Sequence, residues 1–123
     1  MSATILVVDD RAGIRKLLQE VLQSAGYEVI SAASGNEAIT IVGQEKIDLV
    51  LLDMKMSGMD GLETLTKIKE EAPHIVVLIM TAYEELEVLQ EAARQGAAAC
   101  ISKPFDIDEL KELVAQKLRA ASA

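Results

Sequence analysis

Five short apolar segments alternate with longer amphipathic segments along this chain, and this alternation constrains the fold more than any other feature. The apolar segments cover residues 4–8, 28–32, 47–53, 75–80 and 97–101. Most of them are rich in Val, Ile and Leu and too short for helices, which is typical of strands buried on both faces. Strands separated by helices must pair in parallel, with right-handed crossovers. The sequence therefore predicts one parallel sheet with helices on both sides.

The segments between the strands carry the periodicity and the capping residues of helices. Apolar side chains recur every three or four residues from Ile14 to Leu22, and Gly26 is placed to end that helix. Residues 84–95 predict another helix with an acidic first turn. Three more helices are predicted to begin with a side-chain cap followed three residues later by Glu, in the pairs Ser34 with Glu37, Asp60 with Glu63, and Asp106 with Glu109.

Length and composition favour one globular domain over residues 1–123 and exclude several classes of protein. Half of the residues are hydrophobic, and the net charge is −8, from 12 basic and 20 acidic residues. That charge argues against nucleic-acid binding, which requires clustered Lys and Arg. No apolar segment approaches the roughly 20 residues of a membrane span. We expect a cytoplasmic monomer whose acidic surface suits a cation or a basic partner.

Polar residues stand at the ends of four of the predicted strands. Asp9 and Asp10 follow the first strand, Asp53 ends the third, Thr81 follows the fourth, and Lys103 comes just after the fifth. The carboxyl ends of parallel strands lie along one edge of a sheet, where open α/β proteins bind their ligands. We therefore expect three carboxylates, a hydroxyl and an ammonium group to converge in one crevice.

Carboxylates held this close repel one another, and one lysine does not offset the repulsion. Two unit charges about 4 Å apart cost on the order of 4 kcal/mol at an effective dielectric constant near 20. Oxygen ligands without a neighbouring His or Cys favour Mg²⁺, or Mn²⁺ in its place, over zinc. The metal and Lys103 would then neutralise a phosphoryl group that a carboxylate attacks in line.

In this order the residues resemble the receiver domain of bacterial response regulators, from Ile5 to Leu118. The resemblance implies a (βα)5 flavodoxin-like fold with the strand order 2-1-3-4-5. Stand-alone regulators of sporulation phosphorelays are the most similar group, and receivers attached to sigma-54 activators are similar too. The motifs that carry the resemblance are Val7-Val8-Asp9-Asp10, Leu51-Leu52-Asp53-Met54, Met59-Asp60-Gly61, Met80-Thr81-Ala82 and Lys103-Pro104-Phe105.

The resemblance implies a role for each residue of the crevice. Asp53 would accept a phosphoryl group from a histidine kinase or a histidine phosphotransferase and pass it on. Asp10, Asp53 and the backbone carbonyl of Lys55 would bind Mg²⁺, with Asp9 acting through water. The chain would thus be a phosphotransferase toward itself rather than a conventional turnover enzyme.

The remaining implied roles concern the phosphoryl group and the partner. Thr81 would hydrogen-bond the phosphoryl oxygens, Lys103 would pair with them, and the Lys103–Pro104 peptide would be cis. The chain departs from the family at Ser57, where Pro is usual, and at Cys100, where an aromatic is usual; we predict Cys100 to be buried. A partner would dock beside the crevice on Gly13, Ile14, Leu17, Tyr83, Pro104, Phe105 and Ile107.

Two alternatives remain open. The chain could be the receiver of a larger, sigma-54 activator-like transcription factor. A phosphatase of the haloacid-dehalogenase type also uses an Asp nucleophile, Thr, Lys and Mg²⁺. That class normally places its nucleophile two residues before a second Asp at the end of the first strand, whereas Asp9 and Asp10 are adjacent.

Overall fold

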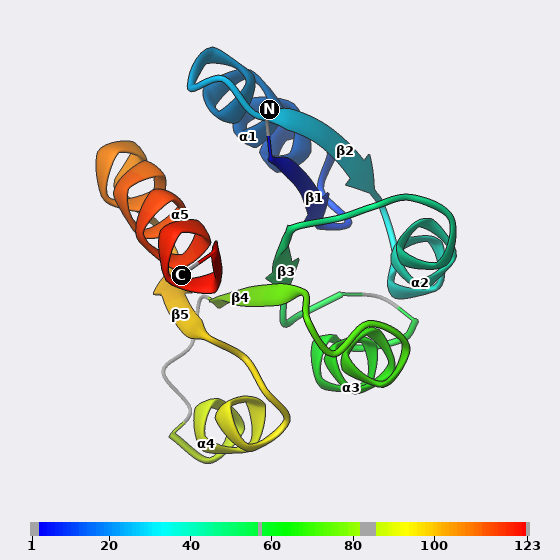
Figure 1. Cartoon of the computed structure of the whole chain (residues 1–123). Coiled ribbons are helices and arrows are strands. Elements are labelled where there is room, and N and C mark those ends of the chain that lie inside the picture. Colours follow the sequence, from blue (N-terminus) through cyan, green and yellow to red (C-terminus); the bar gives the residue numbers. More distant parts are fainter. Residues whose placement is uncertain (1–2, 57, 82–85, 123) are drawn as a thin grey trace.

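A parallel sheet of five strands forms the centre of the computed structural model, which describes residues 3–56, 58–81 and 86–122 (Figure 1). The strand order is β2-β1-β3-β4-β5, and every neighbouring pair is parallel, so the predicted topology is confirmed. The strands are β1 (Thr4–Val8), β2 (Glu28–Ala32), β3 (Leu49–Asp53), β4 (Val76–Thr81) and β5 (Ala99–Ser102).

Five helices cover the two faces of this sheet in the described chain. Figure 1 shows α1 and α5 on one face and α2, α3 and α4 on the other. The predicted caps are confirmed, because Ser34, Asp60 and Asp106 each accept a hydrogen bond from the backbone N–H three residues on, at 2.9–3.2 Å. The helices are α1 (Ala12–Ser24), α2 (Gly35–Gln44), α3 (Gly61–Glu71), α4 (Leu86–Arg94) and α5 (Ile107–Ser122).

The core consists of two apolar clusters, one on each face of the sheet. Successive side chains of a strand point to opposite faces. Val8 and Leu52 therefore join the cluster under α2, α3 and α4, while Val7 and Leu51 join the cluster under α1 and α5. Every residue of β3 is buried, as expected for a central parallel strand. This packing makes the carboxyl end of β3 a rigid platform.

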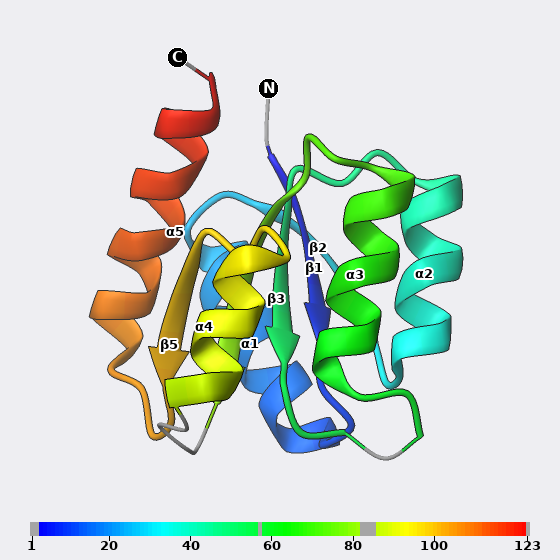
Figure 2. The same cartoon turned by 90° about the horizontal axis from the view of Figure 1, so that it is seen from below.

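The register of the strands brings their carboxyl ends to one edge of the sheet. Val8 pairs with Leu52, so Asp9 lies level with Asp53. Asp53 pairs with Met80, and Thr81 is the residue after Met80 on β4. Figure 2 shows the strands pointing toward the same edge, where the loops after β1, β3 and β5 also lie.

Two expectations about the edge strand β5 were wrong. The strand begins at Ala99 rather than at residue 97, because the N–H of Ala97 donates to the Ala92 carbonyl at 2.9 Å and so closes the end of α4. Cys100 is exposed rather than buried, since its neighbours Ala99 and Ile101 are the residues that face the cluster under α1 and α5. Among the described residues, no helix is both long and apolar enough to span a membrane.

Candidate phosphoacceptor and metal site

The three predicted carboxylates converge at the carboxyl edge of the sheet. Asp9, Asp10 and Asp53 each offer a carboxylate oxygen, and these atoms all lie within 4.8 Å of one another. Asp9 is 0% exposed and Asp53 is 3% exposed, whereas Asp10 lies at the surface. Three acidic groups of which two are buried form a site that favours a cation.

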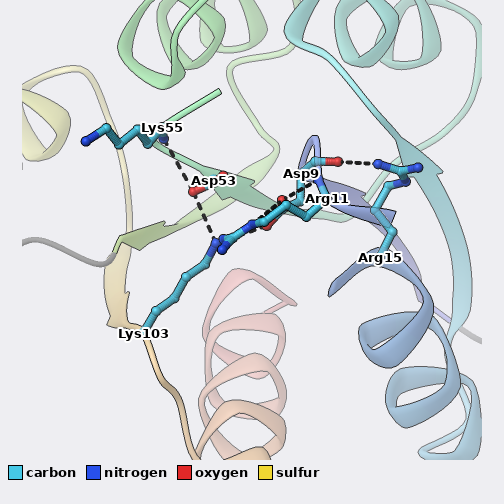
Figure 3. A network of polar contacts seen from close by, with 6 residues as sticks. All are labelled: Asp9, Arg11, Arg15, Asp53, Lys55 and Lys103. Atoms are coloured by element: carbon cyan, nitrogen blue, oxygen red, sulfur yellow. Dashed lines mark hydrogen bonds and ion pairs between the residues drawn. The ribbon is translucent and has the colours of Figure 1, made fainter. Parts of the chain in front are cut away.

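Lys103 joins the two buried carboxylates. Its Nζ donates to Asp9 Oδ2 at 3.0 Å and lies 3.3 Å from Asp53 Oδ1, and its side chain is only 9% exposed (Figure 3). The backbone N–H of Lys103 donates to the Thr81 carbonyl at 2.7 Å, which fixes the start of the loop after β5. The Lys103–Pro104 peptide is cis, as predicted. Lys103 thus supplies one positive charge, which partly neutralises the three carboxylates.

Two arginines that the sequence analysis did not include also hold Asp9. Asp9 Oδ1 accepts hydrogen bonds from the Arg11 backbone N–H at 2.9 Å and from Arg11 Nε at 3.4 Å. Arg15 Nη1 donates to the backbone carbonyl of Asp9 at 2.7 Å (Figure 3). Arg11 and Arg15 lie one turn apart, and the Arg15 N–H donates to the Arg11 carbonyl at the start of α1. The signal in the sequence that could have indicated them is their position, two and six residues after Asp9.

The environment of Asp53 disfavours its ionised form. Burial raises the pKa of this carboxyl above its usual range, and the negative charge of Asp9 raises it further. Lys103 and the backbone N–H of Lys55, which donates to Asp53 Oδ1 at 3.3 Å, lower the pKa but only in part. A further cation near Asp53 would stabilise the carboxylate.

Thr81 lies on β4, the strand next to the one that ends at Asp53. It is the last residue of β4, is 7% exposed, and pairs in register with Ser102, next to Lys103. Its strand runs between β3, which ends at Asp53, and β5. Ser57 and Tyr83 lie outside the described residues, so the predictions for them stay predictions.

Part of the predicted docking surface forms one hollow next to the site. Ile14, Leu17, Pro104 and Phe105 line a hollow of about 380 Å³ together with Arg11 and Lys103. Leu17 is 41% exposed and is the large exposed hydrophobic residue of the described chain. Among the predicted docking residues that the structure describes, Gly13 and Ile107 do not line the hollow.

This fold and this acidic site together define a class of protein. Residues 5–115 match the family model described as the response regulator receiver domain. The chain belongs to the response regulator receiver domain family. A solved receiver domain protein (CheY-like) from Methanospirillum hungatei JF-1 has a TM-score of 0.97 and 32% identity, over 99% of this chain and 98% of that chain.

Within the family, the chain is similar to two kinds of relatives. It is 50% identical over 118 residues to the sporulation initiation phosphotransferase F of Bacillus subtilis (strain 168), covering 96% of this chain and 95% of that protein. It is 43% identical over 114 residues to the transcriptional regulatory protein ZraR of Salmonella typhimurium, covering 93% of this chain but 26% of that protein. The first similarity therefore spans nearly the whole relative, and the second only a quarter.

Proposed function

We propose that this receiver is a phosphorelay response regulator, which accepts a phosphoryl group from phosphohistidine onto Asp53 and passes it to a histidine phosphotransferase. The observation that carries the proposal is the buried Asp53 carboxylate, which lies close to a second buried carboxylate, Asp9, and 3.3 Å from Lys103 Nζ. The similarity to a sporulation phosphotransferase over nearly its whole length supports a relay, in sporulation or a related response.

The transfer requires that a carboxylate oxygen of Asp53 bond to the phosphorus atom while the bond between phosphorus and the donor imidazole nitrogen breaks. The electron pair of that bond leaves with the imidazole nitrogen. Lys103 would pair with the phosphoryl oxygens, and the Thr81 hydroxyl would donate a hydrogen bond to them. The rigid end of β3 would hold Asp53 in line for attack. The reverse steps would pass the group to the next histidine.

We propose that Asp10, Asp53 and the Lys55 backbone carbonyl hold Mg²⁺, with Asp9 acting through water and Mn²⁺ able to substitute. The fit is supported by the three clustered carboxylates, by the position of Lys103 beside them, and by the raised pKa of Asp53. Hard oxygen donors suit a hard divalent cation. When bound, the ion would neutralise charge that develops on the phosphoryl oxygens.

The proposed partners are a histidine kinase and a histidine phosphotransferase. They would dock over the hollow lined by Ile14, Leu17, Pro104 and Phe105, because this apolar surface lies directly beside Lys103. Such partners place a phosphohistidine on a helical surface, which suits a shallow apolar depression. We propose that the domain acts as a cytoplasmic monomer and does not bind nucleic acid or membrane.

A second candidate function is that of the receiver in a larger, sigma-54 activator-like transcription factor. The similarity to a quarter of ZraR supports it. In that case Asp53 would still be phosphorylated, but the phosphoryl group would not be passed on. A phosphatase of the haloacid-dehalogenase type is less well supported, because Asp9, the candidate nucleophile, has both oxygens bound to Arg11 and Lys103.

A phosphotransfer assay separates these functions. The protein would be mixed with Mg²⁺ and a purified histidine phosphotransferase that carries phosphate on its histidine, and both chains would be followed over time. We expect label to move to Asp53 and, on addition of unlabelled phosphotransferase in excess, to move back. Transfer in one direction only would favour the transcription-factor receiver. Turnover of a phosphomonoester that Asp9→Ala abolishes and Asp53→Ala preserves would favour the phosphatase.

A further inference from the structure

We infer that the Arg11 guanidinium is a counter-cation of the metal-free site and competes with the divalent cation for Asp9. Arg11 would thereby set the Mg²⁺ concentration that the domain requires. The inference rests on the proposed function, in which the three carboxylates hold a divalent cation, and it assigns a new role to a residue outside that group.

Both oxygens of the Asp9 carboxylate already have donors. Oδ2 accepts from Lys103 Nζ at 3.0 Å, and Oδ1 accepts from the Arg11 backbone N–H at 2.9 Å and from Arg11 Nε at 3.4 Å. The Asp9 side chain is 0% exposed, so bulk water has little access to it. An ion that draws on Asp9, directly or through a bound water, therefore competes with these three donors for the few lone pairs of the carboxylate.

Of the two charged donors, Arg11 is the one that can leave. The Lys103 side chain is 9% exposed and also lies 3.3 Å from Asp53, so two carboxylates hold it inside the site. The Arg11 side chain is 57% exposed, and its contact with Asp9 is the longer one. Figure 3 shows the guanidinium reaching across to Asp9 from the loop after β1. Its departure would leave the backbone N–H bond to Asp9 intact.

The charges of the site make the Arg11 guanidinium and the divalent cation compete for the same carboxylates. Without metal, Arg11 and Lys103 partly neutralise the carboxylates of Asp9, Asp10 and Asp53. A divalent cation adds two positive charges at the same place and so repels the guanidinium. Each cation therefore weakens the binding of the other, and this coupling is reciprocal. Arg15 does not compete in this way, because it binds the Asp9 carbonyl rather than the carboxylate.

The test is a calorimetric titration of MgCl₂ into the metal-free wild type, Arg11→Gln and Lys16→Gln. Lys16 is an exposed cation on α1, the helix that Arg11 precedes, so its variant removes the same charge from nearby. An ion pair made by an exposed side chain such as Arg11 is typically worth about 0.2–1 kcal/mol, which corresponds to a Kd about 1.4- to fivefold lower for Arg11→Gln than for the wild type. We expect Lys16→Gln to lower the Kd less than Arg11→Gln does.

Urea denaturation of the same three proteins gives a second readout that does not depend on phosphorylation. In EDTA, Arg11→Gln should be less stable than the wild type, and the difference should shrink at saturating Mg²⁺. An equal or higher Kd for Arg11→Gln, or an equal decrease for Lys16→Gln, would overturn the inference while the proposed function stands. A wild type that binds no Mg²⁺ would overturn both.

Discussion

The two ends of strand β3 each carry an aspartate, and the surroundings of these carboxylates differ. Asp48, just before the strand, is half-buried, and its Oδ2 accepts a hydrogen bond from the Thr4 backbone N–H at 2.8 Å. Asp53, the last residue of the strand, is buried beside Asp9 and Lys103. A hollow of about 760 Å³ at the Asp48 end is larger than the one beside Lys103.

Neither an acid nor a large hollow by itself marks the functional end of the sheet. Asp48 satisfies a backbone N–H where β1 begins, so its charge has a local structural use. Asp53 is desolvated and faces a like charge, which disfavours its ionised form in the folded protein. Groups that are unfavourable in this way concentrate at sites of chemistry.

The largest expected effect follows from removing the lysine at the Asp53 end. Lys103→Ala should slow phosphorylation of Asp53 by acetyl phosphate about 100-fold or more, because a preorganised group that stabilises developing charge typically contributes that much. The measurement is the initial rate of phosphoryl incorporation, followed by intact-protein mass spectrometry. Lys46→Ala, which removes an exposed lysine beside Asp48, is the control and should react at the wild-type rate. A decrease of less than tenfold in Lys103→Ala would contradict the account.

The next effect concerns stabilisation by the divalent cation. A ligand at about one hundred times its Kd adds about 2.7 kcal/mol to the free energy of unfolding. Mg²⁺ should stabilise the wild type and Asp48→Asn by that amount in urea denaturation, and Asp10→Asn should lose most of the gain. If Mg²⁺ stabilises Asp10→Asn as much as the wild type, the cation does not bind at the carboxylate cluster.

Asp53→Asn should raise the free energy of unfolding of the metal-free domain by about 1–2 kcal/mol at neutral pH. The substitution removes a buried negative charge, and removing an unfavourable group from a functional site commonly stabilises a protein. The pKa of Asp53 is raised, so the folded state binds more protons than the unfolded state between the ordinary Asp value of 3.8 and the raised one. The free energy of unfolding of the wild type therefore falls as pH rises through that window. Urea denaturation in EDTA at several pH values should show the advantage of Asp53→Asn growing over the same window. A constant advantage, or none, would be inconsistent with the raised pKa.

The smallest effect is expected at the other end of the strand. Asp48→Ala removes the acceptor of the Thr4 N–H and should lower the free energy of unfolding by about 0.5–1.5 kcal/mol, the usual net contribution of one hydrogen bond. Phosphorylation of Asp53 should keep its wild-type rate. A loss of phosphorylation in a folded Asp48→Ala protein would remove the distinction between the two ends.

Most of the fold could be predicted because local and global signals agree. The apolar runs mark β1 and β2 to the residue, and three helices begin at the caps that the Glu spacing indicates. The errors occur where tertiary structure decides. Ala97 closes the end of α4 although its sequence neighbours resemble a strand, and Cys100 is exposed because β5 lies at the edge of the sheet.

The part of the site that follows from the parallel arrangement of the strands could be predicted. The convergence of Asp9, Asp10 and Asp53 follows from where the strands end, without knowledge of side-chain conformation. The position of Arg11 and Arg15 just after the acidic pair indicates that they lie near it, but their particular contacts depend on the angle at which α1 leaves β1. The docking surface was predicted only in part, because residues that are neighbours in sequence, such as Gly13 and Ile14, need not line the same hollow.

Intact-protein mass spectrometry shows whether the Asp53 end of the sheet is a phosphoacceptor site. The wild type and Asp53→Asn would be compared after incubation with acetyl phosphate and Mg²⁺. The account predicts that the wild type gains the mass of one phosphoryl group, that EDTA prevents the gain, and that Asp53→Asn shows none. The same gain in Asp53→Asn, or no gain in a folded wild type that binds Mg²⁺, would contradict it.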